Sequence, residues 1–303
     1  PPSPGGIMRR RLRPARVFTT LALLSVVAAC VAEDTEAPLR ENAEALLFGE
    51  DDRVDYHEVE DEDWRALMRE SIAAVVPTGS IDASDPEDIR LDVESLQERM
   101  ALCDGEPFID QPSGAACTAI LVADEFALLD GCATPYYPAG IAGMSLVFDY
   151  RYTQPGTLET ITSEDIYEVV SHWDVPNGAL GDFISDGSHL VQLDRAVDEQ
   201  RRPVVLSEVV PAIGDALVVI GHSQGLPIKL DAGGELRSVS ASEEFSRHLG
   251  GAWGISSDIF ASLDSETFGL GFGVFNRDRE LIASVFTQPS SNPDGLQWDR
   301  ELE

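Results

Sequence analysis

The sequence predicts an all-β protein. Short apolar stretches recur along the chain, and turn-forming residues separate them. Only two runs, 64–72 and 92–102, have apolar residues at the three- and four-residue spacing of a helix, so the crossover helices that a parallel sheet needs are lacking. We therefore expect a β-sandwich or a pair of β-barrels, with short helical segments toward the N-terminus.

The expected strands follow one another from residue 72 to residue 286. Glycine, proline, aspartate and serine punctuate the intervals between them, as is usual for turns. The sequence shows no internal repeat and no low-complexity tract. The stretches are 72–76, 118–122, 126–129, 144–150, 166–170, 190–193, 203–206, 216–220, 226–230, 273–275 and 281–286.

The charge balance excludes nucleic acid as a partner. The 303 residues include 21 Lys+Arg against 54 Asp+Glu, which gives a formal net charge of −33. Binding to nucleic acid needs a basic face that releases counterions from the phosphates. With 43% hydrophobic and 25% charged residues, the composition is that of a folded globular protein.

The N-terminal region is predicted to be an export signal. Residues 1–7 form a Pro- and Gly-rich leader before Met8, which we interpret as sequence upstream of the native start. Residues 8–29 combine an arginine-rich segment with an apolar stretch that is too short to span a bilayer as a mature helix, as in a signal peptide. The polar residues 30–45 are expected to form a tether.

The end of this signal, Val27-Ala28-Ala29-Cys30, resembles the bacterial lipobox, in which small residues precede a cysteine that is lipidated and becomes the new N-terminus. A plain signal peptide that ends near a cysteine is the alternative. Because Val31 rather than aspartate follows Cys30, similarity to enterobacterial sorting implies the outer membrane or the cell surface. Without lipidation the protein would be periplasmic or secreted. The lipid anchor would be its only contact with the membrane.

Neither the acidic residues nor the histidines predict a metal site or a cofactor. Residues 50–63 are rich in carboxylates, including Asp55, but lack the alternating ligands and the glycine of an EF-hand loop. We interpret this segment as a solvated acidic face. The five histidines are widely spaced and form no H-x-x-x-H pattern. They are His57, His172, His189, His222 and His248.

Three cysteines follow Cys30 in the chain: Cys103, Cys117 and Cys132. For an exported chain this count implies one disulfide bond and one remaining thiol. A bond between Cys117 and Cys132 would close a short loop and contribute on the order of 3 kcal/mol to stability. We predict this pair and a free Cys103.

One pentapeptide, Gly221-His222-Ser223-Gln224-Gly225, fits the G-x-S-x-G pattern of the nucleophile elbow of α/β-hydrolases. The elbow joins a strand to a helix, whereas here Pro227 and a further apolar strand follow, so we predict a hairpin. His248 precedes Asp258, which is the reverse of the hydrolase order. A serine esterase that uses Ser223 is retained as an alternative.

Four blocks between residues 49 and 287 resemble the trypsin-like serine peptidases, in particular the glutamyl-endopeptidase (V8-like) group of bacteria. Residues 117–132 are similar to the family's cysteine, strand, hairpin and T-A-G-H-C ending, and 189–195 to its D-x-A-L-x-x-L-D-R segment. Residues 218–229 resemble V-V-I-G-H-P-x-G-L-P-x-K, and 271–276 stand where the family has G-N-S-G-S-P-V-F-N.

The resemblance implies a chymotrypsin-like fold of two six-stranded β-barrels. The first barrel and the segment before it would span 46–200, and the second 201–290. The two would meet near 199–202, and a tail would occupy 291–303.

The resemblance also implies that the catalytic triad is degenerate. The family's histidine, aspartate and serine correspond to Gly131, Gly187 and Leu270, which can neither accept a proton nor attack a carbonyl. A one-residue shift would restore an aspartate, Asp186, but no shift restores the histidine or the serine.

We therefore predict a catalytically inactive peptidase homologue that binds a peptide or protein in the cleft between the barrels, where edge strands can pair with an extended peptide. Leu270 and Phe272 predict an apolar floor for this cleft. The remaining alternative is an active serine endopeptidase with relocated catalytic residues. It requires His222 or His248 to lie beside a serine.

Overall fold

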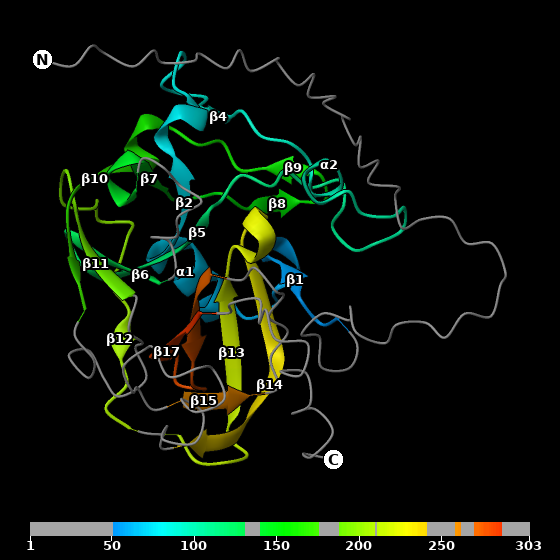
Figure 1. Ribbon diagram of the computed structural model, residues 1–303, viewed down its shortest axis with the longest axis vertical. Coiled ribbons are helices and arrows are strands. Elements are labelled where there is room, and N and C mark those ends of the chain that lie inside the picture. Colours follow the sequence, from blue (N-terminus) through cyan, green and yellow to red (C-terminus); the bar gives the residue numbers. More distant parts are fainter. Residues whose placement is uncertain are drawn as a thin grey trace, which may run out of the picture. The chain divides into compact units, whose positions relative to one another are not determined.

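The computed structural model describes residues 51–130, 140–175, 188–209, 211–240, 258–261 and 270–286. Within these ranges the chain forms mainly β-strands, arranged in a closed barrel and a second sheet (Figure 1). The prediction of an all-β fold is confirmed. The expected signal peptide, the tether and the C-terminal tail lie outside the described residues.

Six strands close the first barrel. They are hydrogen-bonded in the order β10-β11-β6-β5-β2-β7, and β7 pairs in turn with β10. Alternate side chains such as Val75, Leu121 and Val191 fill the interior. In chain order the strands are β2 (Ile72–Pro77), β5 (Cys117–Ala123), β6 (Phe126–Asp130), β7 (Met144–Val147), β10 (Ile166–Asp174) and β11 (Ser188–Leu193).

The second sheet repeats the strand order of the barrel. Numbered along the chain, the barrel strands lie in the order third, second, first, fourth, fifth, sixth. The order β15-β14-β13-β16-β17 follows the same scheme through its fifth strand. Two units of one design are therefore present, although the sequence shows no repeat. The strands are β13 (Ala216–Gly221), β14 (Lys229–Ser240), β15 (Asp258–Ala261), β16 (Leu270–Phe275) and β17 (Glu280–Phe286).

Two short strands extend the second sheet at its ends. β12 (Val205–Leu206) pairs in parallel with β17, and β1 (Val54–Asp55) pairs antiparallel with the start of β14. The smaller elements are β3 (Ile81–Asp82), β4 (Arg90–Leu91), β8 (Tyr152–Gln154), β9 (Thr157–Leu158) and the 3-10 turns Tyr56–Glu58, Thr78–Ser80, Ile141–Gly143, Ser163–Asp165 and Ser223–Gly225.

The first predicted helix forms as α1 (Glu62–Ser71). The Asp61 side chain caps it by accepting hydrogen bonds from the backbone N–H groups of Asp63 and Trp64. The helix buries Met68 and places the Trp64 ring edge-on to Phe275, with ring centroids 6.3 Å apart. It ends where the apolar run of β2 begins.

Three predicted elements are shorter than expected. The strand expected over 203–206 is reduced to β12 (Val205–Leu206). The helix expected over 92–102 is reduced to α2 (Leu96–Met100), because Ser95 and Glu98 cap its start and Ala101 adopts a left-handed conformation with φ 53°. The strand expected over 144–150 stops at Val147, because Asp149 has a φ of 63°.

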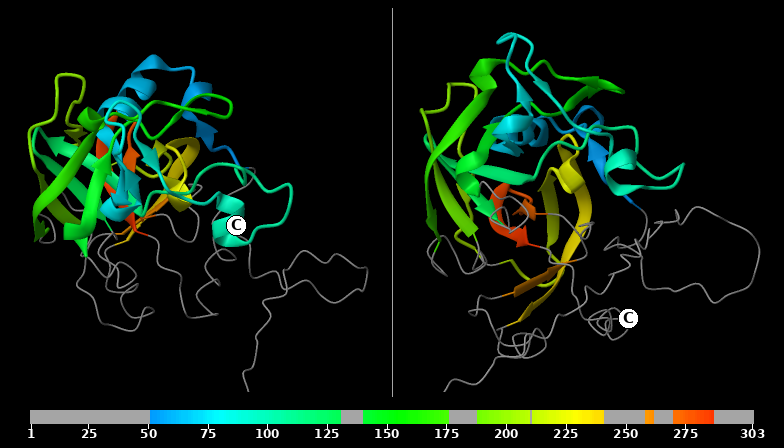
Figure 2. Two further views of the ribbon diagram at one scale, coloured as in Figure 1. Left: turned by 90° about the horizontal axis from the view of Figure 1, so that it is seen from above. Right: turned by 45° about the horizontal axis from the view of Figure 1, so that its top comes forward.

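The barrel and the second sheet share a hydrophobic core along their facing sides. In both views of Figure 2 the orange and red strands β16 and β17 lie beside the barrel. The helix α1 contributes Met68 to this core. Burial of these apolar side chains is the main term that holds the two units together. The other members include Ile72, Ile120 and Leu128 from the barrel and Val218, Ile220, Phe275 and Leu281 from the second sheet.

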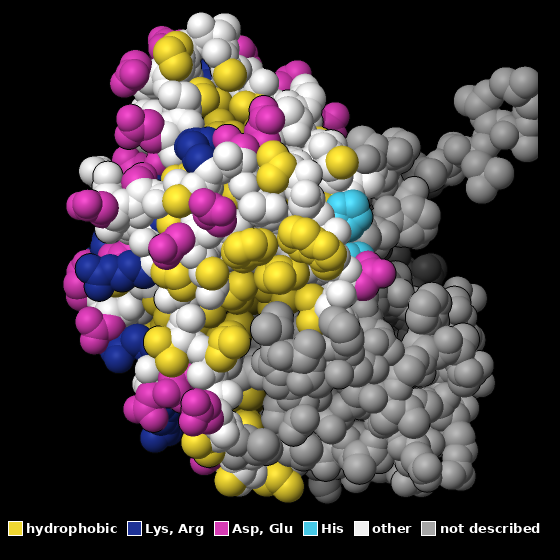
Figure 3. All heavy atoms as spheres, turned by 90° about the vertical axis from the view of Figure 1, so that its left-hand side faces the viewer, with side chains coloured by type: hydrophobic (Ala, Val, Ile, Leu, Met, Phe, Trp, Pro, Cys, Tyr) yellow, Lys and Arg dark blue, Asp and Glu magenta, His cyan; other side chains and the backbone are white. Residues whose placement is uncertain are grey.

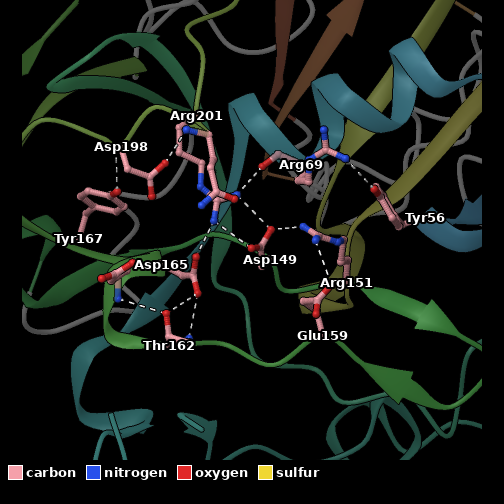
Figure 4. A network of polar contacts seen from close by, with 12 residues as sticks. Tyr56, Arg69, Asp149, Arg151, Glu159, Thr162, Asp165, Tyr167, Asp198 and Arg201 are labelled. Atoms are coloured by element: carbon pink, nitrogen blue, oxygen red, sulfur yellow. Dashed lines mark hydrogen bonds and ion pairs between the residues drawn. The ribbon is translucent and has the colours of Figure 1, made fainter. Parts of the chain in front are cut away.

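A buried arginine, Arg201, holds the segment between β11 and β12, which connects the two units (Figure 4). The Arg201 side chain is 3% exposed and donates to both carboxylate oxygens of Asp149, at 3.0 and 2.9 Å. It also donates to Asp165 at 2.5 Å and to the carbonyl oxygen of Arg69 in α1 at 2.8 Å. The guanidinium lies over the Phe148 ring. The connection, α1 and the barrel are thus held by one group.

Candidate functional site

The three positions that the sequence resemblance assigns to a catalytic triad adjoin strand ends that the structure describes. β6 ends at Asp130 and β11 begins at Ser188, and these two residues are cross-strand partners. Gly131 directly follows Asp130 in the chain and Gly187 directly precedes Ser188, but both glycines lie outside the described residues. Leu270 is the first residue of β16. The loss of the triad therefore stays a prediction from the sequence.

Phe272 belongs to the interior of the second sheet. It is buried and packs in a cluster with Leu217 and Val274. A Cβ atom on Gly221 would lie 2.1 Å from Phe272 Cδ1, so only glycine at position 221 leaves room for the ring. The prediction that Phe272 forms the floor of a cleft is wrong, because β16 directs this side chain into the core.

The G-x-S-x-G pentapeptide forms a turn between two strands. β13 ends at Gly221, the 3-10 turn Ser223–Gly225 follows, and the chain continues into β14. A nucleophile elbow requires a helix directly after the serine. The esterase alternative is therefore contradicted, and the predicted hairpin is confirmed by the pairing of β13 with β14.

Close packing explains the second glycine of this pentapeptide. The carbonyl oxygen of Gly225 accepts hydrogen bonds from the backbone N–H groups of Gly114 and Ala115, at 2.8 and 3.0 Å. Gly225 has a φ of +79°, and a Cβ atom there would lie 2.6 Å from the Ala115 carbonyl oxygen. Glycine at position 225 is thus required because the turn after β13 lies in close contact with the segment before β5.

Ser223 is not activated as a nucleophile. Its buried hydroxyl oxygen accepts a hydrogen bond from Arg53 Nη1 at 3.2 Å. Arg53 in turn binds both oxygens of Asp51, at 2.8 and 2.7 Å. Burial raises the pKa of Asp51, but the hydrogen bonds from Arg53 outweigh this and lower it below its usual value. A guanidinium cannot accept the proton of a serine hydroxyl, so this contact gives no general base.

The neighbouring His222 is a buried, neutral histidine. Its Nδ1 lies 3.0 Å from the Leu226 carbonyl oxygen, to which it donates, and its ring stacks on Tyr150. Nε2 is buried and has no hydrogen-bond partner. Burial lowers the pKa of His222 to about 4, against the opposing effect of the Leu226 carbonyl. Neither ring nitrogen is hydrogen-bonded to Ser223, so His222 provides no support for relocated catalysis. His248 lies outside the described residues.

The acidic N-terminal segment is only partly a solvated face, because Asp55 is buried. It pairs with Lys229, whose Nζ also donates to Gln111 Oε1 at 2.6 Å and to the Pro227 carbonyl oxygen at 3.2 Å. Burial lowers the pKa of Lys229 to about 8, and the carboxylate of Asp55 acts in the opposite direction. The ring of Phe108 covers the ammonium group. In the sequence, the signal was Lys229 within the apolar stretch 226–230, because a buried lysine needs a carboxylate partner.

Two histidines and one aspartate meet at the ends of β10 and β11. His189 Nδ1 lies 3.1 Å from an Asp174 carboxylate oxygen, and the His172 and His189 rings are 6.2 Å apart. Despite this proximity, no group of three side chains suited to a metal ion occurs in the described part of the chain. The same part holds no helix long and apolar enough to cross a membrane.

The cysteine prediction is partly wrong. Cys103 and Cys117 both take part in disulfide bonds, whereas we had expected Cys103 to be free. The expectation failed because it rested on the parity of a count and not on which cysteines the fold brings together. Cys132 and Cys30 lie outside the described residues, so the pairing of Cys117 with Cys132 stays a prediction.

Comparison with known proteins finds similarity among solved structures. No protein-family profile and no curated protein matches the chain. The Rv3671c protease of M. tuberculosis in its inactive form aligns at 10% identity and a TM-score of 0.41, covering 73% of this chain and 79% of that one. The VesB protease of Vibrio cholerae aligns at 13% identity and a TM-score of 0.45, covering 74% of this chain and 59% of that one. The scabies mite inactivated protease paralogue S-I1 aligns at 11% identity and a TM-score of 0.41, covering 82% of this chain and 96% of that one.

Proposed function

We propose that this chain is a catalytically inactive homologue of the trypsin-like serine peptidases, related to the V8-like group, that binds a peptide or protein between its two β units. The observation that carries the proposal is the residue set Gly131, Gly187 and Leu270 at the triad positions. Loss of a single triad member already costs several orders of magnitude in rate, so loss of all three leaves no useful peptidase activity.

The environment of the one serine motif supports this proposal. Ser223 is hydrogen-bonded to a guanidinium, and the histidine beside it is neutral, buried and directed elsewhere. The repeated strand order provides a scaffold of two β units, and we propose that this scaffold lacks an activated serine and a general base. Binding between the units, by pairing of an extended peptide with an exposed strand edge, is the function that such a scaffold retains.

A serine-directed phosphonate probe tests the loss of catalysis. We expect no covalent labelling of the full-length chain under conditions in which trypsin is labelled completely, and no turnover of fluorescent casein. Intact-mass spectrometry gives the labelled fraction. Stoichiometric labelling of any serine would refute the proposal, and a Ser223→Ala variant identifies whether that serine is Ser223.

The binding part of the proposal needs its own measurement. We expect labelled casein to show a saturable change in fluorescence anisotropy that unlabelled casein reverses, with the casein remaining intact. If casein and a panel of unfolded peptides neither bind nor are cut, the cleft has no peptide-binding role.

We propose further that the protein is an exported lipoprotein anchored through Cys30 to the outer membrane or cell surface. The lipobox-like sequence before Cys30 supports this. We expect a Cys30→Ser variant to lose incorporation of radiolabelled palmitate and to move from the membrane to the soluble fraction. Unchanged fractionation and labelling in Cys30→Ser would show that the segment is not a lipobox.

A further inference from the structure

The barrel carries an apolar surface on the outer side of β6, β11 and β10. Leu190 is the cross-strand partner of Trp173, and the rings of Trp173 and Phe126 lie 6.2 Å apart. A β-bulge in β10 exposes Val170 on the same strand. Trp173 is 49% exposed and Val170 is 54% exposed. We name these four side chains the Trp173 surface.

The Trp173 surface continues the core beyond the point where the second sheet covers the barrel. Leu190 and Val122 are half-buried and pack against the core that the two β units share. Phe126 is likewise half-buried, and Trp173 projects beyond it into solvent. Figure 3 looks onto this side of the molecule and shows a continuous hydrophobic area. Contiguous exposed apolar area of this kind marks interaction sites on soluble proteins.

Carboxylates border the same area. Asp124 and Glu125 are exposed in the turn before β6, Glu168 is exposed on β10, and Asp174 is exposed at its end. Figure 3 shows Asp and Glu side chains, with some Lys and Arg among them, along the described border of the hydrophobic area. We propose that the Trp173 surface binds a cationic protein segment that presents a row of apolar side chains, with its lysines or arginines against these carboxylates.

Charge separates this occupant from the other candidates. A second copy of the chain would bring two acidic borders together, and an anionic lipid surface would be repelled by the same carboxylates. Tryptophan is also among the residue types that most often dominate the energy of a protein interface. The inference does not depend on the proposed function, because it uses the outer face of the barrel.

Two designed peptides test the proposal. Both are about 18 residues long with leucines at the same positions, and the polar positions carry lysine in one and glutamate in the other. Fluorescence anisotropy with the full-length chain at about 150 mM salt is expected to show saturable binding of the lysine peptide only. A Trp173→Ser variant is expected to weaken that binding by at least about tenfold.

Ile213→Ser provides the matched control, because Ile213 is 70% exposed in the turn before β13 and is not part of the Trp173 surface. It is expected to bind the lysine peptide as the parent chain does. Urea unfolding shows whether Trp173→Ser remains folded, and Val170→Ser provides a second variant if it does not. Equal binding by Trp173→Ser, equal binding of the two peptides, tighter binding to phosphatidylglycerol vesicles, or a dimer that Trp173→Ser dissociates would each overturn the proposal.

Discussion

Replacing Arg201 by leucine is expected to lower the free energy of unfolding by about 3–5 kcal/mol, because it leaves the carboxylate of Asp165 without its cation and that of Asp149 with Arg151 alone. Arg201 holds Asp149 through two hydrogen bonds and Asp165 through one. It also bonds the Arg69 carbonyl oxygen at the end of α1. Urea unfolding at neutral pH, followed by circular dichroism, measures the loss.

The neighbouring arginine supplies the control. Arg202 is 77% exposed and lies 3.4 Å from a carboxylate oxygen of Glu70, so Arg202→Leu is expected to cost about 1 kcal/mol or less. Arg201→Lys keeps the charge but loses the paired hydrogen bonds, and its stability should fall between those of the parent and Arg201→Leu. Equal stability of Arg201→Leu and Arg202→Leu would show that the buried network contributes no net stability.

The elements of this fold could be predicted where the signal is local. The apolar runs 118–122, 126–129 and 216–220 correspond to β5, β6 and β13, because turn residues bound them on both sides. Helix α2 is shorter than its apolar spacing indicated, because a capping box and a left-handed residue fix its ends. Strand pairing involves residues far apart in the chain, so periodicity could not predict the order that the two β units share.

In the candidate site, too, local features could be predicted and features that depend on distant residues could not. Pro227 after the G-x-S-x-G motif was enough to predict a hairpin, because proline disfavours the helix that an elbow needs. The burial of Asp55 could not be predicted from its acidic surroundings, since its partner Lys229 is distant in the sequence. Phe272 was misplaced for a similar reason: the two faces of β16 are distinguished only by what packs on them.

His222 is expected to make the protein less stable as the pH falls from about 6.5 to about 4. The folded protein keeps this histidine neutral with a pKa of about 4, whereas its ordinary value is 6.5. Between these values the unfolded chain binds a proton that the folded chain does not, so stability is fully present above pH 6.5 and is lost as the pH falls. At about 1.4 kcal/mol for each unit of pKa, the loss is about 3 kcal/mol.

Comparison of variants isolates this proton from the titration of the many carboxylates. A His222→Gln variant is expected to be less stable than the parent at pH 7, because it loses the stacking on Tyr150, but its stability should fall less between pH 6.5 and pH 4. His172→Gln, at an exposed histidine, is the matched substitution measured beside it. The measurement is the urea midpoint at half-unit steps of pH. Parallel curves for the parent and His222→Gln would mean that the buried ring takes up a proton without unfolding, and that Nε2 finds a partner when it is charged.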